Sequence, residues 1–101
     1  RRALVTGATR GIGWEISKAM CEAGAEVYIN GRNTNILDER CAEMEDKGYC
    51  VSPALFDVTE TKAIENWLES LANPPDILVN NAAIRHRYPI INITLKIFPM
   101  S

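Results

Sequence analysis

The sequence lacks any long apolar run, any excess of basic charge and any paired-cysteine motif. Its apolar stretches are strand-sized, as at 77–79, and fall short of the roughly 20 residues that span a bilayer. The formal net charge is -2 and charges of both signs are scattered, so we expect no nucleic-acid partner and no membrane partner. We therefore expect a soluble protein that binds a small-molecule substrate.

The three cysteines, Cys21, Cys41 and Cys50, are odd in number and show no C-x-x-C spacing. This usage favours reduced thiols and a cytoplasmic location, and it predicts no metal site. Arg1 and Arg2 lead directly into a short strand, without the apolar segment of a secretory signal.

Short apolar segments alternate with amphipathic helices along the whole chain. Such an order predicts βαβ units and a parallel sheet with helices on both faces, and we treat residues 1–101 as one domain. The predicted strands are 3–5, 27–29, 50–56 and 77–79.

The three predicted helices have recognisable start signals. The first begins near Gly11 and ends at Gly24, the second is capped by Asn33-Thr34, and Thr59 is predicted to cap the third. Helical spacing places the following residues of the first helix on its inward face: Ile12, Ile16, Ala19, Met20 and Ala23. The helical spacing around Trp14 and Trp67 favours a packing role for both over base stacking.

The strongest motif is Thr6-Gly7-Ala8-Thr9-Arg10-Gly11-Ile12-Gly13, between the first strand and the first helix. Glycines there allow a pyrophosphate to approach the backbone, and the N–H groups at the start of the helix bind anions. This position predicts half of a doubly wound Rossmann fold, with strand order 3-2-1-4. An ordinary tight turn is the alternative that the context disfavours.

The motif resembles the T-G-x-x-x-G-x-G signature of the short-chain dehydrogenases/reductases. Asp57-Val58 and Asn80-Asn81-Ala82-Ala83 follow in the order expected for the family's adenine-contacting Asp and its N-N-A-G motif. Ala83 departs from the family pattern, which usually has Gly. The resemblance covers residues 3 to 85 and implies cofactor contacts by Gly7, Arg10, Gly11, Ile12, Gly13, Asp57, Val58, Asn81, Ala82 and Ala83.

The choice between NAD and NADP is made at the end of the second strand, where an NAD enzyme usually has Asp or Glu. This chain has Asn30-Gly31-Arg32-Asn33. A guanidinium can pair with a 2′-phosphate, so Arg32 and Asn33, assisted by Arg10, favour NADP over NAD. The alternative is that Arg32 is a solvated turn residue and Arg10 an exposed loop charge.

The segment Ile84-Arg85-His86-Arg87-Tyr88-Pro89 follows the fourth strand and is placed to face a substrate. With NGRN, it resembles the gluconate 5-dehydrogenase branch of the family, which implies a sugar-acid substrate; two arginines suit a carboxylate. A solvated basic loop is the alternative, and it is favoured for His86 alone.

The family's Tyr-x-x-x-Lys pair is missing, since residues four positions after Tyr28, Tyr49 and Tyr88 are Arg, Pro and Asn. We therefore assign no catalytic residue and interpret the chain as a fragment that is inactive alone. The tail from Ile90 is expected to begin a helix capped by Thr94, leaving the fourth strand as an exposed, association-prone edge.

Two classes of function stay open. The first is an NADP-dependent oxidoreductase that interconverts an alcohol and a ketone, with a homo-oligomeric parent enzyme; reduction of a 3-oxoacyl thioester is the runner-up to sugar-acid oxidation. The second is a non-catalytic nucleotide-binding protein.

Overall fold

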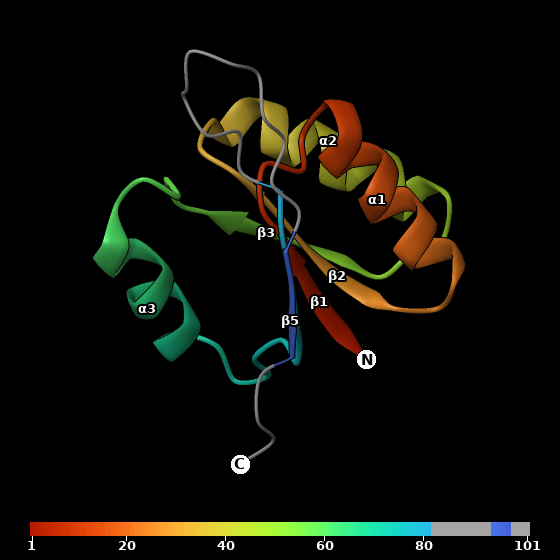
Figure 1. Ribbon diagram of the computed structural model, residues 1–101. Helices are drawn as coiled ribbons and strands as arrows, with labels where there is room; N and C mark the ends of the chain where they lie inside the picture. The colour runs from red at the N-terminus through yellow and green to blue at the C-terminus, as the bar shows by residue number, and fades with distance from the viewer. Residues whose placement is uncertain (82–93, 98–101) are drawn as a thin grey trace.

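The computed structural model describes residues 1–81 and 94–97, and strands and helices alternate through most of that span (Figure 1). The strand-helix order expected from the sequence is confirmed as far as the fourth strand. The elements are β1 (Arg2–Val5), α1 (Gly11–Glu22), β2 (Glu26–Gly31), α2 (Thr34–Asp46), β3 (Val51–Leu55), α3 (Thr61–Glu69), β4 (Ile77–Asn80) and β5 (Thr94–Ile97).

One sheet runs through the molecule in the order β3-β2-β1-β4-β5. The first four strands in this order are parallel, with β1 in the middle: Val5 is paired with Ile29 on one side and with Val79 on the other. The predicted parallel order 3-2-1-4 is therefore confirmed. Because β1 has a neighbour on each side, the loop that follows it lies at the centre of the carboxyl edge.

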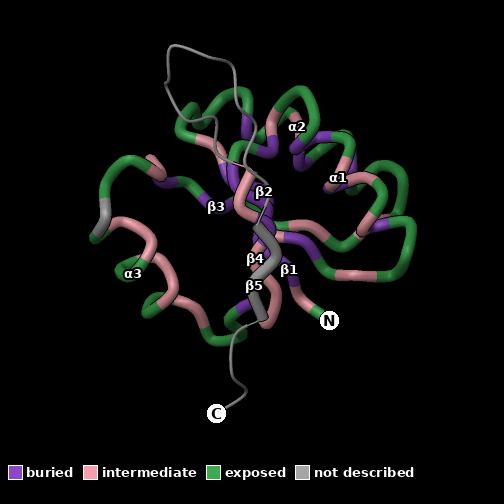
Figure 2. Tube along the Cα trace, in the orientation of Figure 1, coloured by how far each residue is buried: buried purple, intermediate pink, exposed green. Residues whose placement is uncertain are grey.

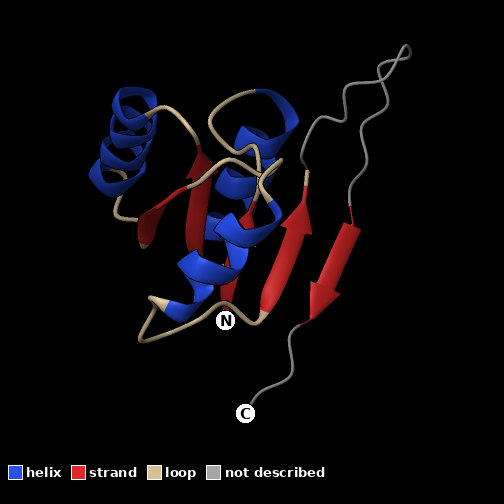
Figure 3. Cartoon of the chain, turned by 90° about the vertical axis from the view of Figure 1, so that its left-hand side faces the viewer, coloured by secondary structure: helices blue, strands red, loops and turns tan. Residues whose placement is uncertain are grey.

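The segment 94–97 corrects the prediction of a helix capped by Thr94. It forms β5, which runs antiparallel beside β4 and pairs Leu78 with Lys96 (Figure 3). β4 is consequently not the edge of the sheet. A helix halted by Pro99 forms few hydrogen bonds, whereas a strand here satisfies the open N–H and C=O groups of β4.

Helices cover both faces of the sheet, as predicted: α1 and α2 lie on one face and α3 on the other (Figure 1). Alternate strand residues supply the two cores, so Val5 and Ile29 pack beneath α1 and α2 while Leu4 points toward α3. The purple segments of Figure 2 follow the strands and the inner faces of α1 and α2. Trp14 belongs to the first core and Trp67 packs on the second, which confirms the packing role predicted for both.

Two helix predictions were wrong in detail. Of the residues predicted to face inward on α1, Ile16 and Met20 pack against the core, whereas Ile12 is 44% exposed and Ala19 and Ala23 are exposed. The buried residues of the helix are Gly13, Trp14, Ser17 and Cys21, so the prediction is right only in part. The N-cap of α3 is Glu60 rather than Thr59, because the Thr59 hydroxyl donates to Asp57.

None of the described helices has the length and apolar character needed to cross a membrane.

Candidate functional site

The predicted site residues lie where the parallel strands end. The glycine-rich turn follows β1, Arg32 and Asn33 follow β2, Asp57 and Val58 follow β3, and Asn81 follows β4. In a doubly wound sheet, this carboxyl edge is where ligands bind. Ala82, Ala83 and the segment 84–89 fall outside the described residues.

The glycines of the turn have distinct structural roles. Gly7 and Gly11 have φ angles of 58° and 63°, a region that side-chain-bearing residues rarely adopt. Gly13 has no space for a side chain, since an added Cβ would lie 2.3 Å from the carbonyl oxygen of Gly7 and 2.5 Å from Nδ2 of Asn81. The helix therefore begins in direct contact with the turn and with the residue that follows β4.

The N-terminus of α1 presents positive electrostatic character to this edge. The N–H of Trp14 donates to the carbonyl of Arg10 at 3.4 Å. The N–H groups before it belong to the first turn of the helix, where a backbone N–H has no acceptor within the helix. The N-cap residue Arg10 is exposed, and the first turn holds no acidic residue. Such a terminus suits the diphosphate of a dinucleotide.

Ile12 lies beside an open, largely apolar hollow of about 500 Å³ on the flank of α1. The hollow is lined by Gly11, Ile12, Trp14, Glu15, Ile16 and Ala19. All of these residues belong to α1, so the hollow is a feature of the outer surface of the helix rather than a cleft between elements.

Asn30 is a site residue that the sequence reasoning missed. Its side chain accepts from the N–H of Gly7 at 3.0 Å and donates to the carbonyls of Ala54 and Phe56, each at 3.0 Å. Its own carbonyl accepts from Ala8 N–H at 2.9 Å, and the residue is 2% exposed. Asn30 thus joins the glycine-rich turn to the end of β3; the only signal for it was a polar residue closing an apolar strand.

Thr6 makes the corresponding link to β4. Its hydroxyl donates to Oδ1 of Asn80 at 3.1 Å and accepts from the N–H of Asn81 at 2.8 Å. The first motif and the third are therefore joined directly, a contact that the sequence analysis did not predict.

Asp57 and Arg32 face each other across the ends of β3 and β2. Oδ2 of Asp57 lies 3.8 Å from Nη1 of Arg32, whose side chain is 70% exposed. The backbone N–H of Thr59 donates to Oδ1 of Asp57 at 2.9 Å and the Thr59 hydroxyl at 2.7 Å. The pKa of Asp57 is lowered, first by that N–H, then by the hydroxyl; burial opposes them less strongly, and the lowering effect of Arg32 is the smallest of the four. Asp57 is accordingly a carboxylate at neutral pH, and an exposed pair at this distance leaves Arg32 free to take another anion.

Asn33 and Val58, also predicted to contact the cofactor, have structural partners of their own. Asn33 caps α2, because its Oδ1 accepts from the N–H of Ile36 at 3.1 Å, so the predicted cap is confirmed. Val58 packs at the margin of the core beneath α3. Within residues 1–81 and 94–97, no three His, Cys, Asp or Glu side chains are grouped so as to hold a metal ion.

The family model described as short chain dehydrogenase matches residues 1–99. A curated relative, gluconate 5-dehydrogenase of Gluconobacter oxydans (strain 621H), is 43% identical over 98 residues, which are 94% of this chain and 38% of that protein. The chain thus spans well under half the length of this relative.

Solved structures share both fold and sequence with the chain. A gluconate 5-dehydrogenase from Burkholderia cenocepacia J2315, in complex with NADP and tartrate, has a TM-score of 0.79 and 39% identity, covering 88% of this chain and 36% of that one. A 3-oxoacyl-(acyl-carrier protein) reductase from Brucella melitensis with bound NAD has a TM-score of 0.78 and 32% identity, covering 87% and 34%. With the glycine-rich turn, Asp57 and Asn81 gathered at one edge of the sheet, these matches show that the chain belongs to the short chain dehydrogenase family.

Proposed function

We propose that residues 1–101 form the dinucleotide-binding domain of an NADP-dependent oxidoreductase that interconverts an alcohol and a ketone. The contacts of Gly13 with Gly7 and Asn81 support this proposal, because they bring two family motifs together at a helix N-terminus. When bound, the nicotinamide would supply or accept the hydride. The chain's own residues would hold the diphosphate and the adenosine.

The preference for NADP rests on Arg32. Its exposed guanidinium follows the end of β2. Asp57, the carboxylate that lies 3.8 Å from it in the described part of the chain, is already bonded to Thr59. A 2′-phosphate can pair with such a guanidinium, whereas an unmodified ribose gains little from it. The solved gluconate 5-dehydrogenase holds NADP, which agrees with this preference.

The substrate that we propose is a sugar acid and its keto form, by analogy with the gluconate 5-dehydrogenases that the chain resembles. The basic segment 84–89 is the part of the chain that we assign to its carboxylate. Reduction of a 3-oxoacyl thioester is the second candidate, because a reductase of that class is also a structural relative.

We further propose that the 101 residues alone bind the cofactor but do not catalyse the reaction of the substrate. The sequence has no Tyr-x-x-x-Lys pair, the motif in which a lysine ammonium group helps a tyrosine phenol to exchange the substrate's proton. A cytoplasmic location and a homo-oligomeric parent enzyme stay predictions.

The direct test is to titrate the chain and its Arg32→Ala variant with NADPH and with NADH, following cofactor fluorescence. We expect the chain to bind NADPH more tightly, and the variant to lose about ten- to a hundredfold in NADPH affinity, since hydrogen bonds to charged groups contribute about 1.5 to 3 kcal/mol. Its NADH affinity should change little. Equal losses for both cofactors would show that Arg32 does not contact the 2′-phosphate, and no binding of either by the chain would contradict the proposed function.

A further inference from the structure

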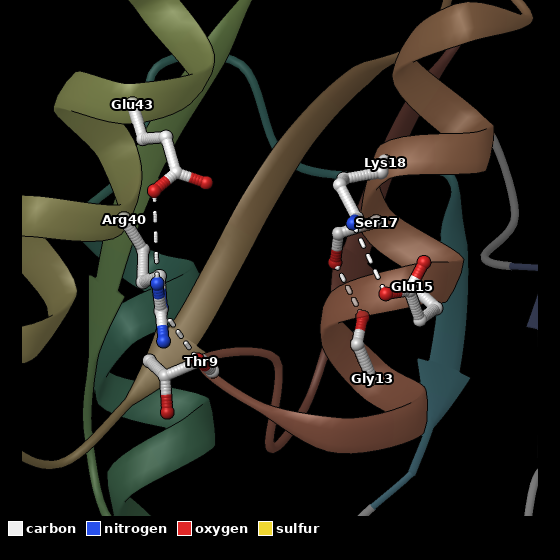
Figure 4. Close-up of polar contacts among 7 residues, drawn as sticks. All are labelled: Thr9, Gly13, Glu15, Ser17, Lys18, Arg40 and Glu43. Atoms are coloured by element: carbon white, nitrogen blue, oxygen red, sulfur yellow. Dashed lines mark hydrogen bonds and ion pairs between the residues drawn. The ribbon is translucent and has the colours of Figure 1, made fainter.

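Arg40, on α2, contacts the glycine-rich turn, although no family motif includes it. Its Nε donates to the carbonyl oxygen of Thr9 at 2.8 Å (Figure 4). From this contact and those described below, we propose that Arg40 is a positioning residue for dinucleotide binding, one that fixes the phosphate-binding turn without touching the cofactor. The proposal rests on the function proposed above.

The guanidinium of Arg40 is itself held on two further sides. Its central carbon lies 5.0 Å from the ring centroid of Trp14, which is 9% exposed, and its Nη1 lies 3.7 Å from Oε1 of Glu43. The ring restricts the plane of the guanidinium, while the exposed Glu43 attracts it only weakly at this distance. The side chain of Arg40, 35% exposed, is therefore oriented chiefly by Thr9 and Trp14.

Thr9 also lies close to the end of β2. A Cβ built on Gly31 would lie 2.7 Å from Cγ2 of Thr9, so the absence of a side chain at Gly31 makes room for this residue. The methyl group of Thr9 is thus near Gly31, and the hydrogen bond from Arg40 sets the direction of its carbonyl.

That direction determines where the next N–H points. The peptide unit between Thr9 and Arg10 is planar and trans, so its N–H points opposite to its carbonyl. With the carbonyl bonded to Arg40, the N–H of Arg10 is turned away from α2. Arg40 thereby fixes a donor at the entrance to α1, and it does so from the helix that also follows Arg32.

The test compares three variants of the full chain. Arg40→Met removes the donors but keeps a long apolar side chain beside Trp14, and Arg40→Lys restores one charged donor. Arg2→Met is the matched control, because it breaks an exposed pair with Glu26 (2.7 Å) away from the turn. For each variant we would measure the NADPH and NADH dissociation constants, the melting temperature and the backbone ¹⁵N order parameters.

For Arg40→Met we expect both dinucleotides to bind about tenfold more weakly, in an unchanged ratio, because the diphosphate is common to both. The order parameters of Thr9 and Arg10 should fall from about 0.85 toward about 0.6, while β1 and β2 stay rigid. Arg40→Lys should recover part of the dinucleotide affinity and part of the order parameters of Thr9 and Arg10. The melting temperature should change no more than in Arg2→Met.

Unchanged order parameters in Arg40→Met would overturn the proposal. A loss confined to NADPH would also overturn it, because Arg40 would then be contacting the 2′-phosphate. If the unmodified chain binds neither dinucleotide, the proposed function fails by itself, and the order parameters of Thr9 and Arg10 still decide whether Arg40 positions the turn.

Discussion

At the scale of single residues, Asn30 links the glycine-rich turn to the end of β3. Its amide uses one acceptor and two donors on backbone groups of the glycine-rich turn and of β3. Water cannot replace these bonds without entering the sheet, because the residue is 2% exposed. The geometry of the turn therefore depends on an amide that has no contact with the cofactor in our account.

We predict that Asn30→Ala lowers the free energy of unfolding by about 3 kcal/mol, since it leaves buried backbone groups unpaired at about 1 to 3 kcal/mol each. Urea denaturation measures this loss. Asn35→Ala, the same change at an exposed position of α2, is the control and should stay within about 0.5 kcal/mol of the parent. Equal effects of the two substitutions would contradict the role assigned to Asn30.

Sequence reasoning found some of these residues and missed others for a physical reason. Gly7, Gly11 and Gly13 were predictable because a turn that receives a diphosphate needs glycine at fixed spacings. Asn30 and Arg40 were not, because their roles depend on strands and helices that meet only in the folded chain. A polar residue in a strand, or an Arg in a helix, has no local feature that indicates its partner.

At the scale of elements, β5 is the main difference between expectation and structure. The order β1 to β4 followed from apolar segments separated by amphipathic helices, since that periodicity is local. The pairing of 94–97 with β4 is not local: it depends on the open edge of a strand that ends fourteen residues earlier. Similarly, the inward face of α1 was predicted only in part: Ile16 and Met20 pack on the core, but the contact of Gly13 with Gly7 and Asn81, which also constrains the helix, is not visible in the sequence.

If β5 protects the edge of β4, breaking it should promote association. We predict that Lys96→Pro, which removes a backbone N–H opposite Leu78, raises the sedimentation coefficient with increasing protein concentration. Lys96→Ala keeps that N–H and should behave like the parent chain. A Lys96→Pro variant whose sedimentation matches that of Lys96→Ala at every concentration would show that β5 does not protect the edge.

At the scale of the whole molecule, the parallel sheet places three sequence-distant motifs at one edge. Thr6 bonds to the last residue of β4 and to Asn81 after it, Asn30 bonds to the end of β3, and Arg32 faces Asp57. We propose that these contacts form a single dinucleotide site, with the diphosphate at the start of α1 and the 2′-phosphate at Arg32.

The most direct test is to map NADPH onto the chain by the changes it causes in backbone amide chemical shifts. We predict that the largest changes fall on Gly7, Arg10 to Gly13, Arg32, Asp57 and Asn81, and that NADH gives the same pattern with a weaker change at Arg32. Changes centred on α3 or β5, or no saturable change at all, would contradict it.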